Sequence, residues 1–69
     1  MRDQLRKTLQ NRLAMLRDEM PFFPEGMRMD PKQLLRETVE QDLAIAKVDG
    51  NKREIAECEL SLLLVDELA

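Results

Sequence analysis

Cys58 carries the only thiol in this sequence, and a thiolate is a common nucleophile in enzymes. The chain contains no histidine, so the usual base that activates such a thiol is missing. The adjacent Glu57 and Glu59 raise a thiol pKa, which keeps the sulfur protonated and weakly reactive. We therefore interpret Cys58 as a small core residue and expect this protein not to be an enzyme.

Carboxylates at helical spacing form a second candidate site, for a metal ion. Its ligands would be Glu37, Glu40 and either Glu57 or Glu59, if two helices turned these side chains toward each other. Carboxylate metal sites in helical bundles normally add a histidine three residues after a glutamate, and this sequence has none. Solvated helix faces with local ion pairs explain the carboxylates better, so we expect neither a metal nor a cofactor.

Nucleic-acid binding is a third possibility, because side chains suited to phosphates and base edges gather near the N-terminus. These side chains are Arg2, Arg6, Lys7, Gln10 and Arg17. The basic excess is small, however: residues 1–20 hold five basic and three acidic residues, whereas residues 51–69 hold two basic and five acidic ones. The acidic remainder repels phosphate, so a small nucleic-acid-binding regulator is the alternative function and not the preferred one. The two ends of the chain are complementary in charge.

The size of the chain indicates that it needs a partner. Its 69 residues form one domain, residues 1–69, and 43% apolar with 36% charged residues is typical of a folded, soluble protein. A domain this small hides only about 60% of its unfolded surface when it folds alone. Such domains usually add disulfides, a metal or another chain, and a single cysteine excludes an internal disulfide. We therefore expect a homo-oligomer, with a dimer favoured, or a complex with another protein.

No segment of the sequence resembles a membrane span. The longest apolar run covers residues 62–65, far short of the roughly 20 residues that a span requires. No apolar stretch of the kind found in secretory signals follows Met1. The sequence therefore predicts a cytoplasmic protein that does not bind membranes.

An all-α fold must position these residues, and its first helix is expected over residues 2–20. Apolar residues recur there at steps of four or three, which places them on one narrow helical stripe. The stripe consists of Leu5, Leu9, Leu13, Leu16 and Met20, and Met1 would extend it by one turn. Pro21 ends the helix because its ring removes an amide donor. Phe22 and Phe23 then provide the only aromatic rings with which to fill the end of a small core.

Two further helices are expected over residues 31–49 and 52–68. Asp30, Pro31 and Gln33 form a typical helix start, and Asn51 with Glu54 forms a second one. Gly50 is suited to the left-handed conformation that closes a helix. Such a short joint predicts that the second and third helices form an antiparallel hairpin, with the first helix packed across it.

The C-terminal half of the third helix is apolar on nearly every side and must therefore be covered on every side. Dimerisation through residues 60–69 would cover it, although the first helix and the Phe22–Phe23 loop could do so within one chain. The predicted contact residues are Leu60, Leu63, Leu64 and Leu68, with Leu9, Leu13 and Leu16 as a second candidate seam. From this pattern we expect a non-enzymatic protein that acts by helix-mediated contact: an adaptor, an inhibitor, a small chaperone, or an accessory protein of a phage or plasmid.

Overall fold

Helix α1 spans Arg2–Glu19 and ends one residue before its predicted boundary. The computed structural model describes residues 2–69, so Met1, expected to extend the stripe, lies outside the described residues. Pro21 lies in a short 3-10 turn, η1 (Met20–Phe22), because the missing amide and the fixed backbone angle of proline interrupt the α-helical hydrogen bonds. A second 3-10 turn, η2 (Glu25–Met27), completes the connection to the next helix.

Helix α2 spans Pro31–Asp49, as predicted, but its start uses only part of the expected signal. Asp30 occupies the capping position, yet its side chain accepts no capping hydrogen bond. The Gln33 amide oxygen instead accepts a hydrogen bond of 3.4 Å from Arg36. The predicted capping box at Asp30 is therefore wrong, and Pro31, whose backbone angle is already helical, marks the helix start.

The joint between the second and third helices forms as predicted. Gly50 adopts a left-handed conformation with φ of 68°, and its amide and that of Asn51 donate back to the carbonyls of Lys47 and Ala46. This pair of bonds satisfies two carbonyls that the end of a helix would otherwise leave unpaired. The Asn51 side chain then accepts a hydrogen bond of 3.2 Å from the Glu54 amide and caps the next helix.

Helix α3 spans Lys52–Val65 and ends three residues before its predicted boundary. The amides of Glu67 and Leu68 donate to Leu64 and Val65, three residues back, so a tight turn replaces the last helical turn. As a result the backbone turns aside after Val65, and Leu68 is buried against the other helices.

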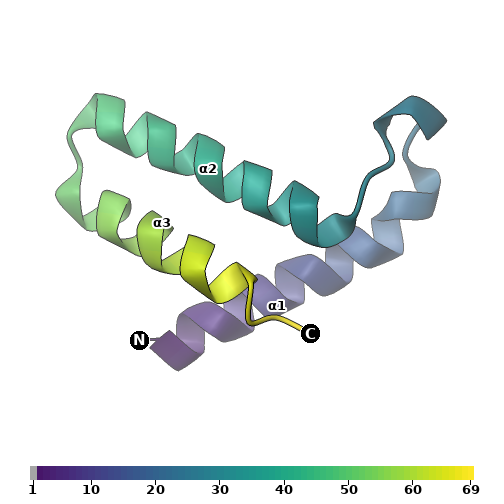
Figure 1. Ribbon diagram of the computed structural model, residues 1–69, viewed down its shortest axis with the longest axis horizontal. Helices are drawn as coiled ribbons and strands as arrows, with labels where there is room; N and C mark the ends of the chain where they lie inside the picture. Colours follow the sequence, from purple (N-terminus) through teal and green to yellow (C-terminus); the bar gives the residue numbers. More distant parts are fainter. Residues whose placement is uncertain (1) are drawn as a thin grey trace.

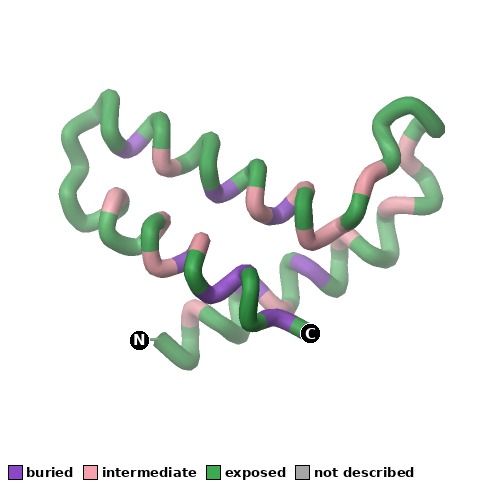
Figure 2. The backbone as a smooth tube through the Cα atoms, in the orientation of Figure 1, coloured by how far each residue is buried: buried purple, intermediate pink, exposed green. Residues whose placement is uncertain are grey.

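The predicted all-α architecture is confirmed: α2 and α3 pack closely as a hairpin, and α1 contacts both. Figure 1 shows α1 crossing the hairpin at the end where α2 begins and α3 finishes. The core lies at this crossing and consists of Leu9, Leu13, Leu35, Val39, Leu64, Val65 and Leu68. Figure 2 shows buried positions concentrated there, while the backbone around the α2–α3 joint is exposed.

The chain is flat and incompletely covered. Its Cα atoms extend 37 × 26 × 14 Å, and their radius of gyration is 12.8 Å against about 11 Å for a compact domain of this length. The accessible surface is 5113 Å², whereas a folded monomer of 8.1 kDa exposes about 4,500 Å². The fold therefore leaves about 600 Å² more surface exposed than its mass requires.

Candidate functional site

The structure divides the seven predicted contact leucines into two groups. Four of them, Leu9, Leu13, Leu64 and Leu68, lie in the core of the single chain. The end of α3 is thus covered by α1 and α2, which is the arrangement that the sequence left as the alternative to a dimer. Leu16 and Leu60 are half-buried against the same core, and only Leu63 is largely exposed, at 67%.

The Phe22–Phe23 loop does not contribute to this covering in the way its composition suggested. Phe22 is 86% exposed and Phe23 is only half-buried. Arg28 holds the loop by donating hydrogen bonds of 3.0 Å to the carbonyls of Phe23 and Pro21. The two turns η1 and η2 project the connection beyond the end of the hairpin, so the expected aromatic plug is wrong (Figure 1).

The residues predicted to bind nucleic acid mostly face the chain's own C-terminal segment. Arg2 and Arg6 lie 3.4 and 3.3 Å from the same carboxylate oxygen of Glu67. Arg17 donates to the Ala69 carbonyl, and Gln10 accepts a bond of 3.4 Å from the Ala69 amide. Lys7 alone of the five makes no hydrogen bond or ion pair with any residue in 2–69.

Two basic residues of α2 also contact residues 66–69. Lys32 donates to the carbonyls of Leu68 and Asp66 at 2.9 and 3.4 Å, and Arg36 pairs with the Asp66 carboxylate. We call the five basic residues that hold residues 66–69 the basic collar: Arg2, Arg6, Arg17, Lys32 and Arg36. The collar places positive charge at the C-terminal end of α3, where the helix dipole and unpaired carbonyls are negative.

Cys58 lies at the edge of a shallow hollow between α2 and α3 that Asp42, Ile45, Glu54 and Glu57 also line. Burial raises the pKa of its thiol, and the carboxylates of Asp42, Glu54 and Glu57 raise that pKa further. The predicted direction of the shift is confirmed, although Asp42 and Glu54 contribute and Glu59 does not. A protonated thiol is a poor nucleophile and a poor metal ligand.

The carboxylates considered for a metal site do not come together. Glu37 and Glu40 are exposed on α2, and Glu57 pairs instead with Arg53 of its own helix at 3.5 Å. Within residues 2–69, no three side chains of the carboxylate, thiol or imidazole type are grouped so as to hold an ion.

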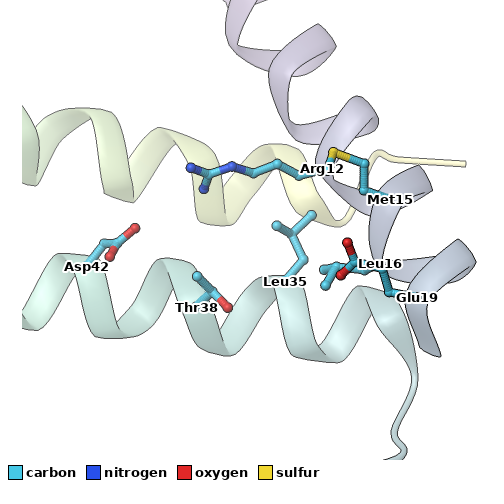
Figure 3. Close-up of a pocket in the computed structure, with 7 residues that line it drawn as sticks. All are labelled: Arg12, Met15, Leu16, Glu19, Leu35, Thr38 and Asp42. Atoms are coloured by element: carbon cyan, nitrogen blue, oxygen red, sulfur yellow. The ribbon is translucent and has the colours of Figure 1, made fainter. Parts of the chain in front are cut away.

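A groove of about 370 Å³ lies between α1 and α2. We call it the α1–α2 groove, and its lining residues are Arg12, Met15, Leu16, Glu19, Leu35, Thr38 and Asp42. Figure 3 shows Leu35 and Leu16 toward its narrow end, where the two helices converge, and Arg12 and Asp42 toward its open end. Apolar side chains thus line a hollow with Arg12 and Asp42 toward its open end and a second carboxylate, Glu19, beside Leu16 at its converging end.

Two exposed apolar side chains lie in or next to this groove. Met15 on α1 is 60% exposed and lines the groove, whereas Ile45 on α2 is 59% exposed and lines the neighbouring hollow between α2 and α3, one turn beyond Asp42. Sequence reasoning missed Met15, because it lies off the apolar stripe of its helix. For Ile45 a signal was present: α2 carries a wider apolar face than a two-helix contact covers.

Comparison of the chain with protein-family models, with curated proteins and with solved structures found no match. No helix formed by residues 2–69 combines the length and apolarity needed to cross a membrane. The exposed surface of the chain itself is therefore the basis for assigning a function.

Proposed function

We propose that this protein acts by helix-to-helix contact with another protein chain, that it self-associates, and that it catalyses no reaction. The observation that carries the proposal is a pair of exposed apolar side chains in adjoining hollows: Met15 in the α1–α2 groove and Ile45 in the hollow between α2 and α3, which shares Asp42 with the groove. Isolated exposed apolar residues are ordinary on protein surfaces. Here each lines a hollow between two helices, α1 and α2 for Met15 and α2 and α3 for Ile45, and a hollow between helices is the shape that an amphipathic helix fills.

The surface area of the chain supports the same proposal. The excess of about 600 Å² over a typical monomer is of the order that each partner buries in a small specific interface, whereas a standard interface buries about 800 Å² per partner. A contact of that size restores the burial that the flat three-helix arrangement leaves incomplete. The proposed contact surface is therefore not the predicted one at residues 60–69, because most of the leucines there pack in or against the core of the single chain.

The other functions considered have less support. The raised pKa of Cys58 disfavours a role as nucleophile. Four of the five residues suited to nucleic acid hold Glu67 and Ala69, so an incoming phosphate would have to compete with these contacts. No observation on the structure favours nucleic-acid binding as a second function.

Sedimentation velocity over a wide concentration range, paired with affinity capture from the native cell, tests the proposal. The capture compares the wild type with the Met15→Glu/Ile45→Glu variant, in which charge replaces exposed apolar groups and the core is untouched. Support is a mass that rises with concentration, or a protein that the wild type retains and the variant loses. A monomer at every concentration, together with identical captured proteins, would contradict the proposal, as would capture of nucleic acid alone.

A further inference from the structure

We infer that the α1–α2 groove receives a second copy of this chain, in a symmetric dimer whose two-fold axis runs along the groove within the interface. The inference rests on the proposed function and makes it specific: it names the partner and the surface. In a two-fold dimer the same patch meets itself, so that patch must be complementary to its own rotated copy. The shape and the charges of the groove both meet this requirement.

The α1–α2 groove is complementary in shape to its own rotated copy because it has both a hollow and an exposed side chain, Met15, that can fill the hollow of the other copy. Leu35 is buried and Leu16 half-buried along the hollow, while Met15 stands at its rim with 60% of its surface exposed. A two-fold axis along the groove sets α1 of each copy over α2 of the other. Met15 of one copy then enters the groove of its partner, and methionine suits this role because its unbranched side chain adapts to irregular gaps.

The charges are complementary in the same arrangement. Arg12 on α1 and Asp42 on α2 lie toward the same open end of the groove (Figure 3), and neither takes part in an ion pair or side-chain hydrogen bond with any residue from 2 to 69. Setting α1 over the partner's α2 brings Arg12 of one copy toward Asp42 of the other. The symmetry forms this pair twice, so each dimer gains two ion pairs from side chains that are unpaired in the single chain.

The surface excess of the whole chain indicates the size expected for the interface. An excess of about 600 Å² per chain lies at the lower limit of specific interfaces, below the standard 800 Å² or so per partner. Interfaces of that size belong to weak and transient complexes, so we expect a dissociation constant in the micromolar range. Higher salt should weaken the dimer, because the ion pairs at the groove rim are exposed to solvent.

Charge reversal tests the inference, with sedimentation equilibrium as the measurement. Arg12→Glu places two acidic groups opposite each other, and Asp42→Arg places two basic groups opposite each other, so each variant alone should dimerise at least about tenfold more weakly. An equal mixture of the two variants should restore dimers as heterodimers, because each rim position then meets an opposite charge. Only contact between copies produces this recovery, since no charge changes within either chain upon mixing.

Two variants serve as controls, and circular dichroism establishes that every variant remains helical. Lys7→Glu reverses an exposed charge on α1 that does not line the groove, so it should leave dimerisation unchanged. Leu63→Glu tests the outer face of α3 and should also leave dimerisation unchanged.

The inference is overturned if the wild type is monomeric, if mixing restores no dimer, or if Leu63→Glu abolishes dimers that the two rim variants leave intact. A monomeric wild type that still captures a protein partner through Met15 and Ile45 would overturn the second copy as occupant and the proposed self-association, and would leave standing the proposed contact with another protein.

Discussion

At the scale of single residues, Cys58 shows how neighbouring charges determine reactivity. Its thiol is partly buried between α2 and α3, and three carboxylates from both helices hold its pKa above the ordinary value. The sequence predicted the direction of this shift from the adjacent Glu57 and Glu59, of which only Glu57 contributes. It could not supply Asp42, because that contact exists only once the hairpin has formed.

The raised pKa of Cys58 predicts a pH dependence that alkylation with iodoacetamide measures. The rate should follow the thiolate, so its midpoint in the folded protein should lie at higher pH than in the urea-unfolded chain. Because the folded state favours the protonated thiol, its contribution to stability is present below the ordinary thiol pKa and is lost as pH rises through the folded pKa. Equal midpoints in the folded and unfolded chains would contradict the assigned environment.

Neighbouring leucines on α3 predict opposite effects on the free energy of unfolding. Leu64 is fully buried, so Leu64→Ala should cost about 2–4 kcal/mol through lost contacts and the cavity left behind. Leu63 is 67% exposed, so Leu63→Ala should change stability by less than about 0.5 kcal/mol. Urea unfolding followed by circular dichroism measures both, and similar losses for the two variants would show that α3 is rotated from its described position.

At the scale of elements, helix positions could be predicted well because their signals are local. Pro21 and Gly50 act through their own backbone chemistry, and α2 begins and ends where the sequence placed it. The end of α3 was predicted less well, since residues 66–68 have ordinary helical propensity. Residues 66–68 contact residues that are distant in the sequence, including Lys32 and Arg36. A short sequence pattern contains no information about such contacts.

The two capping residues predict different costs when truncated. Asn51 accepts a hydrogen bond from Glu54, so Asn51→Ala should lower the free energy of unfolding by about 1 kcal/mol. Asp30 makes no such bond, and Asp30→Ala should cost clearly less. Thermal unfolding of the matched pair measures the difference. A larger loss at Asp30 than at Asn51 would reverse the assignment of the two caps.

The basic collar predicts a stabilising role for Lys32. Lys32→Met keeps the apolar stem but removes the hydrogen bonds to the Leu68 and Asp66 carbonyls, which should cost about 1 kcal/mol. Lys47→Met is the matched control, since Lys47 is an exposed lysine of the same helix with no hydrogen bond or ion pair to residues 2–69. Chemical denaturation should separate the two variants, and equal stability would contradict a structural role for the collar.

At the scale of the whole molecule, the sequence indicated that a single chain buries too little of its apolar surface, but not which part of that surface stays exposed. The apolar end of α3 suggested the predicted dimer surface, because periodicity shows which residues are apolar and not which neighbours cover them. In the structure α1 crosses that end and buries Leu64 and Leu68. The large apolar side chains that stay exposed lie on all three helices and on the connection after α1: Met15, Phe22, Met27, Ile45, Val48 and Leu63. The crossing angle of α1 depends on side-chain packing between helices, and no local motif encodes it.

The central claim, a second copy seated in the α1–α2 groove, is tested most directly by isotope-filtered nuclear Overhauser spectroscopy. The sample is an equal mixture of carbon-13-labelled and unlabelled chains at about 1 mM, where a micromolar dimer is nearly saturated. We predict cross-peaks between the Met15 methyl of one copy and the methyl groups of Leu16 of the other, because Leu16 is the partly exposed leucine of the groove. Absence of intermolecular cross-peaks, or cross-peaks that originate from Leu63 instead, would contradict the account.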